Sequence, residues 1–259
     1  MAALNLCSVL VTGANQGIGL ELVKQLLGNS NSPECIFATC QDPAGERMQE
    51  LQKLEAKHPN LVIIALDVTD PASIKAAAAR VETHLKGSGL NLLINNAGIV
   101  KLNTLESETP EDMALVYATN VTGPLLVSQA FLPLLKQAAQ GSPQTGLSCS
   151  KAAIINISSE GGCIQNVCGW RTVQIISYRC SKAALNMLTK YQALGYGGDG
   201  ILSVAVHPGW VQTDMGNSSS VQAPLTVEAS VRGMLHMLST LCEKDNGGFA
   251  NWEGKVLPW

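Results

Sequence analysis

Short runs of apolar residues alternate along the chain with longer stretches in which apolar positions recur at helical spacing. The short runs are continuously apolar, as expected for strands that are covered on both faces of a parallel sheet. They predict strands at Cys7–Val11, Cys35–Thr39, Leu61–Leu66, Leu90–Ile94, Ala153–Ile157, Ile201–Val206 and Gly254–Leu257.

The longer stretches predict helices between these strands. Two of them begin with a capping residue followed by proline, Asp70-Pro71 and Thr109-Pro110, which is typical of a helix start. The predicted helices are Gly17–Leu27, Ala44–Lys57, Pro71–Lys86, Pro110–Gln137, Tyr178–Leu194 and Thr226–Leu241.

This alternation favours an α/β fold with one doubly wound parallel sheet in a three-layer α/β/α arrangement. No repeat or linker divides the chain, so we expect a single domain over residues 1–259. In such a sheet, ligands bind beyond the carboxyl ends of the strands. Glycine and polar residues gather at four of these ends, at positions 12–19, 95–98, 158–159 and 207–210.

Composition narrows the class of protein. Hydrophobic residues make up 46% of the 259 residues, which excludes a disordered chain. Charged residues make up 14%, the net charge is −3, and Lys and Arg form no block. We therefore expect neither nucleic acid nor an anionic membrane surface as a partner.

We expect a cytoplasmic protein without a membrane span or a metal site. The first seven residues lack the basic region of a signal peptide. The uncharged run Met113–Leu135 is long enough to cross a bilayer, but Asn120, Pro124 and Pro133 favour a buried core helix. The eight cysteines follow no disulfide or zinc-finger spacing, and we expect reduced thiols.

The glycines Gly13, Gly17 and Gly19 lie between a predicted strand and a predicted helix. The first glycine permits a tight turn, and the later ones let a pyrophosphate approach the N–H groups at the start of the helix. The spacing differs from the common G-x-G-x-x-G pattern, and glycines needed only for packing are the alternative. The context of strand and helix favours cofactor binding.

Tyr178 and Lys182 are four residues apart in a predicted helix, so their side chains share one face. A cation there favours the phenolate and lowers the pKa of a tyrosine that otherwise titrates at about 10. Such a tyrosine can protonate a carbonyl oxygen or deprotonate an alcohol. Alone, the spacing is common and usually belongs to a solvated helix face.

Taken in order, the glycine loop, Asn95-Asn96-Ala97-Gly98, Asn120, Ser159 and Tyr178-x-x-x-Lys182 resemble the classical short-chain dehydrogenases/reductases. The resemblance runs from Leu10 to about Met215 and implies a Rossmann-type dinucleotide-binding catalytic domain. The segments 208–215 and 254–259 are similar to the sniffer/C-factor-like carbonyl reductases within that family.

The resemblance implies a role for each of these residues. Tyr178 is expected to be the general acid and base, and Lys182 to bind the nicotinamide ribose. Ser159 is expected to hydrogen-bond the substrate carbonyl, with Ser158 as its rival by position. Asn120 is expected to support a water-linked proton relay from its helix. The expected cofactor contacts are Gly13, Asn15, Gln16, Gly17, Ile18, Gly19, Gln41, Asp67, Val68, Asn95, Ala97, Gly98, Tyr178, Lys182, Pro208, Gly209, Val211 and Thr213.

The choice of nicotinamide cofactor falls at the end of the second strand, where an acidic residue favours NAD and a basic one NADP. Cys40 stands where an NAD-type carboxylate is expected, and Gln41 where relatives that prefer NADP commonly carry arginine. The missing acid favours NADP(H), with Arg47 as a compensating cation in the next loop. Asp42 keeps NAD open as an alternative.

Two segments depart from the family pattern. Residues 160–177, between Ser159 and Tyr178, are longer than usual and predict an enlarged loop beside the substrate pocket. Residues 137–150 are long and polar and predict a surface insertion. We expect His207 to satisfy local backbone groups and not to act as a base.

Together these features predict reversible hydride transfer between NADP(H) and a carbonyl/alcohol pair, with a hydrophobic ketone, aldehyde or quinone as the small-molecule substrate. Two alternatives stay open: an NAD-linked alcohol dehydrogenase, and a cofactor-occupied binding or signalling protein. The resemblance further implies a homodimer.

Overall fold

A computed structural model describes residues 4–167, 169–170, 173–217 and 222–259. Within them, one parallel sheet has the strand order β3-β2-β1-β4-β5-β6-β7. The chain winds outward from β1 to β3 and then continues on the other side of β1, which confirms the predicted doubly wound fold. The strands are β1 (Ser8–Val11), β2 (Cys35–Cys40), β3 (Leu61–Ala65), β4 (Leu92–Asn95), β5 (Ala153–Ile157), β6 (Leu202–His207) and β7 (Phe249–Asn251).

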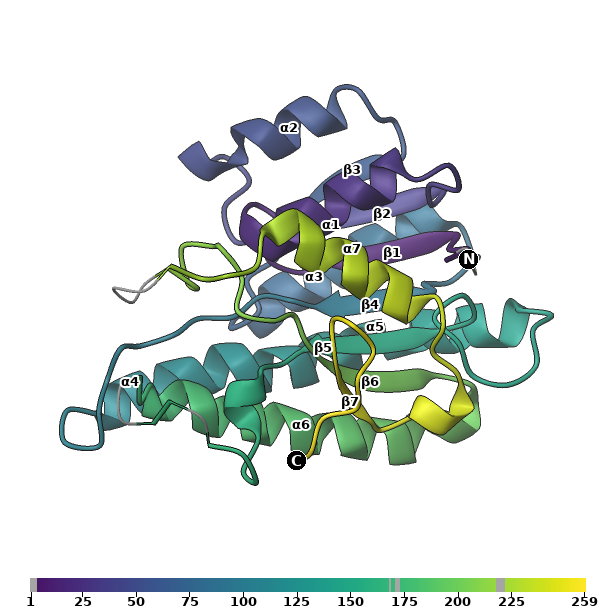
Figure 1. Ribbon diagram of the computed structural model, residues 1–259. Helices are drawn as coiled ribbons and strands as arrows, with labels where there is room; N and C mark the ends of the chain where they lie inside the picture. Colours follow the sequence, from purple (N-terminus) through teal and green to yellow (C-terminus); the bar gives the residue numbers. More distant parts are fainter. Residues whose placement is uncertain (1–3, 168, 171–172, 218–221) are drawn as a thin grey trace.

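Helices cover both faces of the sheet (Figure 1). One face carries α1 (Gly17–Gly28), α2 (Gln49–Glu55) and α7 (Val227–Leu238). The other carries α3 (Pro71–Leu85) and α5 (Gly123–Gly141). Two further helices, α4 (Pro110–Tyr117) and α6 (Ile176–Tyr196), pack on each other. The side chains of Asp70 and Thr109 cap α3 and α4, as predicted from the sequence.

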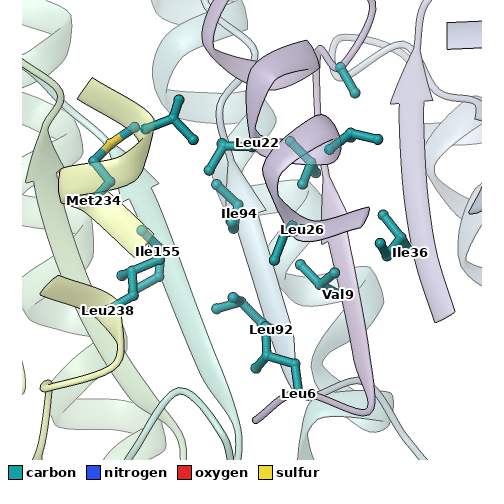
Figure 2. Packing of buried hydrophobic residues seen from close by; sticks show 14 of the residues in the cluster. Leu6, Val9, Leu22, Leu26, Ile36, Leu92, Ile94, Ile155, Met234 and Leu238 are labelled. Atoms are coloured by element: carbon teal, nitrogen blue, oxygen red, sulfur yellow. The ribbon is translucent and has the colours of Figure 1, made fainter. Parts of the chain in front are cut away.

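The hydrophobic core is divided by the sheet, because successive side chains of a strand point to opposite faces. Val9 and Val11 of β1 belong to the cluster under α1 and α7, and Leu10 to the cluster under α3 and α5. Figure 2 shows the first cluster, with Leu22, Leu26, Met234 and Leu238 lying over Val9, Ile94 and Ile155. Each such buried side chain contributes about 1.5–3 kcal/mol to folding, so the two layers fix the sheet rigidly beneath its carboxyl edge.

The predicted helix Pro110–Gln137 is interrupted in the structure. A π-helical turn, η2 (Ala118–Thr122), separates α4 from α5. Pro124 has no N–H and therefore cannot donate the regular helical hydrogen bond to the carbonyl of Asn120. The whole stretch Pro110–Gly141 is long and apolar enough to cross a membrane by length and composition alone, and 44% of its most apolar window is buried inside the protein.

The predicted last strand, Gly254–Leu257, is wrong. The strand that joins the sheet is β7, and the chain then turns back on it. Asn251 makes this turn, because its side-chain oxygen accepts hydrogen bonds from the N–H groups of Glu253 and Lys255. Gly254 supports the turn with a φ of 84°, and Val256 then pairs antiparallel to Ala250.

Two further predicted boundaries shift. The helix expected over Ala44–Lys57 begins later, because Asp42 holds residues 42–45 in a turn through its contact with the N–H of Ala44. A 3-10 turn, η1 (Glu46–Met48), then leads into α2. The expected insertion after Gln137 begins later too, since α5 continues to Gly141, and the partly exposed loop that follows buries Cys149.

Candidate active site

A cleft of about 1340 Å³ lies beyond the carboxyl ends of the central strands. The segments that follow β1, β4, β5 and β6 all contribute to its walls, as the sequence predicts from the position of their polar residues. Such a cleft at the point where the strand order reverses is the usual binding place of a doubly wound sheet.

The glycine loop lines one end of the cleft and fits a dinucleotide. Gly13 and Gly17 adopt left-handed backbone angles, with φ of 64° and 51°. Gly19 does not line the cleft; a Cβ there would lie 2.3 Å from the carbonyl oxygen of Gly13, so glycine lets α1 pack against the loop. Gln16 begins α1 without a side-chain cap, which leaves the start of the helix to a phosphate.

Thr12 and Asn96, to which no role was assigned from the sequence, join the glycine loop to the segment after β4. The hydroxyl of Thr12 accepts hydrogen bonds from the N–H groups of Asn96 and Ala97, at 2.9 and 3.0 Å. The amide of Asn96 donates to the carbonyls of Thr12 and Gly13. Thr12 directly follows β1 and Asn96 directly follows β4, and these positions at the ends of neighbouring strands could have indicated the contact.

The predicted cofactor contact of Asn95 does not fit the structure. Its side chain points into the core, where its amide donates to Ser128 and to Asn156 at 3.2 and 2.9 Å, and it does not line the cleft. Successive residues of a strand point to opposite sides, so Asn96 lines the cleft in its place.

Gln41 and Asp67, which follow β2 and β3, lie together in the wall of the cleft. The amide of Gln41 donates to one carboxylate oxygen of Asp67 at 2.7 Å, and the other oxygen accepts from the N–H and the hydroxyl of Thr69. The hydrogen bond from Thr69 is the main reason why the pKa of Asp67 is lowered. Asp67 therefore caps the strand end and lines the cleft at the same time.

Arg47 is a basic side chain at this end of the cleft. Its guanidinium donates a hydrogen bond to Gln16 of the glycine loop and forms an ion pair with Asp214 at 3.2 Å. Both members of the ion pair are largely exposed to solvent.

Ser159, Tyr178 and Lys182 line the same cleft. The hydroxyl of Ser159 accepts the N–H of Gly161 at 3.0 Å and is hydrogen-bonded to the Tyr178 phenol. The Nζ of Lys182 lies 5.5 Å from the centre of the Tyr178 ring and donates to the carbonyl of Ile157 at 2.8 Å.

The predicted lowering of the Tyr178 pKa is wrong for this arrangement. Burial raises the pKa of Tyr178, and the hydrogen bond from Ser159 and the charge of Arg179 counteract this only in part. Lys182 lies over the face of the ring, and burial lowers its own pKa to about 8. At neutral pH the phenol therefore keeps its proton.

The structure distinguishes the two candidate serines. The hydroxyl of Ser158 is buried and donates to Asn186 at 2.6 Å, away from Tyr178. Ser159 is the residue that meets Tyr178. Strand alternation separates the two, because adjacent side chains point to opposite sides of the sheet edge.

Asn120 lies in η2, fully buried, and its side chain does not line the cleft. The side chain exchanges two hydrogen bonds with the backbone of Ile99, both 2.9 Å long, and donates to Ser181 at 3.0 Å. Ser181 in turn donates to the carbonyl of Tyr178. Asn120 thus connects the segment after β4 to the helix that carries Tyr178.

The segment after β6 closes the cleft over the glycine loop. Pro208, Gly209, Val211 and Thr213 all line it, and a Cβ on Gly17 would lie 3.2 Å from the methyl group of Thr213. The hydroxyl of Ser230 in α7 fixes this segment through the carbonyl of Pro208 at 2.6 Å. The remaining predicted cofactor contacts also line the cleft, namely Asn15, Ile18, Val68, Ala97 and Gly98.

Comparison with known proteins places the chain in a family. The short chain dehydrogenase family matches residues 8–223. An uncharacterised oxidoreductase of Schizosaccharomyces pombe is 31% identical, with 96% of each chain covered. The chain belongs to the short-chain dehydrogenase family.

Solved structures of this family are similar over nearly the whole chain. The NADPH-bound carbonyl reductase from chicken fatty liver is 64% identical, with a TM-score of 0.95 and 99% of this chain and 100% of that chain covered. The carbonyl reductase Sniffer of Drosophila melanogaster is 38% identical, with a TM-score of 0.92 and 98% and 100% covered. These likenesses confirm the predicted family, its sniffer-like branch and the enzyme class, an oxidoreductase.

The loop between Ser159 and Tyr178 lies beside the cleft, as the sequence predicts for this short-chain dehydrogenase. It begins with a 3-10 turn, η3 (Glu160–Gly162), and Gly161, Gly169, Val173 and Ile175 line the cleft. Cys168 and residues 171–172 of the loop lie outside the described residues. Across the part of the chain that is described, no group of three metal-ligating side chains gathers.

His207 differs from its expected role. Its Nδ1 is buried and finds no hydrogen-bond partner among the described residues, so it does not satisfy local backbone groups through this atom. Burial lowers the pKa of His207 to about 4. The ring lines the cleft next to Glu160.

Proposed function

We propose that the protein reduces hydrophobic ketones, aldehydes or quinones with NADPH, and that Ser159, Tyr178 and Lys182 carry the reaction. This proposal rests on the observation that these three side chains lie together in one cleft, which the glycine loop also lines. The NADPH found in the chicken carbonyl reductase supports the same cofactor here. When bound, NADPH supplies the hydride for the carbonyl carbon.

The serine and the tyrosine have complementary tasks in this proposal. When the substrate binds, the Ser159 hydroxyl turns its one proton from Tyr178 to the substrate carbonyl oxygen. Tyr178 donates the proton that this oxygen needs as it becomes an alcohol. The raised pKa of Tyr178 suits the reductive direction, because the phenol holds its proton at neutral pH. Donors that are fixed before the substrate arrives stabilise the charge that develops on the oxygen.

We propose that Lys182 holds the nicotinamide ribose and that Asn120 acts through its backbone. Since Pro124 cannot donate to the carbonyl of Asn120, that oxygen can accept a hydrogen bond from a water molecule of the proton relay. The Asn120 side chain has a separate task, because its contacts with Ile99 and Ser181 fix the walls on either side.

We propose Arg47 as the side chain that binds the 2′-phosphate of NADPH. Gln41 is neutral and already donates to Asp67. Arg47 lies at the same end of the cleft, and its ion pair with Asp214 is exposed and hence worth only about 0–1 kcal/mol. A phosphate, with its paired acceptor oxygens, can displace that carboxylate.

The apolar lining supports a hydrophobic substrate. The cleft that contains Ser159 and Tyr178 is also lined by Ile99, Leu102, Leu115, Val173 and Ile175. Such walls favour the uncharged carbonyl compounds named above over sugars or acids.

We further propose a soluble cytoplasmic homodimer that interacts with neither membranes nor nucleic acid. Met187, Tyr191 and Leu194 form an exposed apolar stripe on α6, with exposed fractions of 60%, 68% and 73%. Their spacing places them on one face of the helix. In this proposal α5, the longer helix of the apolar stretch Pro110–Gly141, covers the sheet and does not cross a membrane.

The experiment is oxidation of NADPH and of NADH, in parallel, against a panel of ketones, aldehydes and quinones. We expect turnover with NADPH that falls at least a hundredfold in Tyr178→Phe, because general acid catalysis contributes about 10²–10⁴. Tyr191→Phe on the same helix is the matched control and should keep full activity. Full turnover by Tyr178→Phe would contradict the proposal, as would NADPH binding without turnover of any compound, which favours a binding or signalling protein. Faster reaction with NADH would favour the NAD-linked alternative.

A further inference from the structure

His207 and Glu160 form a polar pair in the cleft wall that the proposed reaction does not use. His207 is the last residue of β6, and Glu160 directly follows Ser159. The Nε2 of His207 lies 3.7 Å from a carboxylate oxygen of Glu160. The exposed fractions of the two side chains are 15% and 49%, and both residues line the cleft.

The protonation of the ring follows from its surroundings. The low pKa of His207 keeps the ring neutral at physiological pH, with one N–H and one bare nitrogen. The Nδ1 is buried without a partner among the described residues, and an unpaired N–H there would cost free energy. A proton on Nε2 instead faces the Glu160 carboxylate. The pair therefore presents one hydrogen-bond donor and one strong acceptor, side by side.

The turn that carries Glu160 is fixed against the catalytic helix. Gly162 and Cys163 donate backbone hydrogen bonds to Ser159 and Glu160, both 2.9 Å long. Gly162 packs so closely on α6 that a Cβ would lie 2.6 Å from the carbonyl carbon of Lys182. A Cβ on Gly161 would lie 3.8 Å from the Tyr178 ring. The backbone of the turn that carries Glu160 is thus fixed next to Tyr178 and Lys182.

We propose that His207 and Glu160 bind a hydroxyl group of the substrate, so that the preferred substrates are ketones or aldehydes with a hydroxyl close to the carbonyl. A hydroxyl oxygen accepts a hydrogen bond from the Nε2–H of His207, while the hydroxyl donates a hydrogen bond to the Glu160 carboxylate. Ser159 and Glu160 line the same cleft, so one small molecule can reach both. This inference rests on the proposed reductase function.

The test compares ketones that differ only in a hydroxyl or a methyl group. The pairs are α-hydroxyacetophenone with propiophenone, and 3-hydroxypropiophenone with butyrophenone. We expect the ratio of kcat/KM for the hydroxy ketone over that for its partner to fall about tenfold in Glu160→Gln and in His207→Leu. The fall should arise mainly from KM for the hydroxy ketone. Because each variant is compared with the parent by a ratio, the intrinsic reactivity of the two ketones cancels.

Glu82→Gln, an exposed carboxylate on α3 outside the cleft, is the matched control and should leave the ratio unchanged. An unchanged ratio in Glu160→Gln would overturn the inference while leaving the reductase function intact. If no ketone, aldehyde or quinone of the panel is turned over, the proposed function fails. In that event, calorimetry measures Kd for the two ketones of each pair, in the NADP⁺-loaded parent and in NADP⁺-loaded Glu160→Gln. The change in the ratio of these two Kd values between the proteins then decides the inference.

Discussion

Arg47 is the residue on which nucleotide selection depends in the proposed function. Replacing it with glutamine removes the cation that meets the 2′-phosphate but keeps a polar side chain beside Gln16. We expect Kd for NADPH to rise about 10- to 100-fold, because hydrogen bonds to charged groups contribute about 1.5–3 kcal/mol. The Kd for NADH should change little, since it has no 2′-phosphate.

Titration of the protein fluorescence with each nucleotide measures both constants. Lys24→Gln is the comparison, because Lys24 also lines this end of the cleft but is paired with Glu50. A larger loss of NADPH affinity in Lys24→Gln than in Arg47→Gln would assign the 2′-phosphate to Lys24 and contradict the role proposed for Arg47.

His207 makes the free energy of unfolding depend on pH in the acidic range. Its pKa is about 4 in the folded protein and 6.5 in the unfolded chain, so the unfolded chain binds more protons between these values. The contribution of neutral His207 to the free energy of unfolding is therefore fully present well above pH 6.5 and is lost as the pH falls toward 4. From this group we expect a loss of about 2 kcal/mol between pH 7 and pH 5.

Urea unfolding at the two pH values measures this loss, and His207→Leu should remove most of it. The same dependence in the parent and in His207→Leu would assign the acid sensitivity to another group. His58→Leu is the control, since His58 lies outside the cleft and should leave the difference unchanged.

At the scale of elements, the helix that carries Tyr178 begins under constraint. Ile175, its N-cap residue, has a left-handed φ of 42°, which is unfavourable for a β-branched side chain, and it provides no cap. Glu108 supplies the cap from the segment before α4, because its carboxylate accepts the N–H of Ser177 at 2.9 Å. Burial works against ionisation of Glu108, yet the hydrogen bonds from Ser177 and Asn103 outweigh it and lower the pKa.

We expect Glu108→Ala to destabilise the protein by about 1 kcal/mol, the usual value of a helix cap. It should also lower kcat several-fold without changing Kd for NADPH, because Ser177 directly precedes Tyr178. Glu108→Gln keeps one acceptor oxygen and should restore part of both losses. Urea unfolding and steady-state kinetics measure these effects, with Glu106→Ala, an exposed carboxylate of the same loop, as the control. Reduced stability with an unchanged kcat in Glu108→Ala would show that the cap does not position Tyr178.

This cap illustrates what the sequence can and cannot predict. Periodicity locates the helix to within two residues of its start at Ile176, because the pattern is local. Glu108 and Ser177 are 69 residues apart, and no local pattern joins them. The sequence could not decide between Ser158 and Ser159 for the same reason, because the choice depends on which side of the sheet edge each side chain faces.

At the scale of the whole molecule, the order of strands and helices predicts the fold because parallel strands need crossovers, and crossovers follow a fixed hand. The last strand was predicted wrongly because β7 has only three residues, Phe249–Asn251, which is too short for an apolar run to stand out. Its partner segment then folds back through a turn at Asn251, a choice made by side-chain hydrogen bonds and not by hydrophobicity.

The apolar stripe on α6 leads to a prediction for the assembly. If a second copy covers Met187, Tyr191 and Leu194, the parent should have twice the mass of one chain by light scattering at micromolar concentration. Tyr191→Glu should halve that mass, because a buried unpaired charge costs several kcal/mol at an interface. Val256→Glu is the control, since Val256 is equally exposed, at 75%, but lies on the turn after β7. A parent protein with the mass of a single chain would exclude the dimer, and the stripe would then be ordinary exposed surface. A dimer that persists in Tyr191→Glu would place the interface on another face of the molecule.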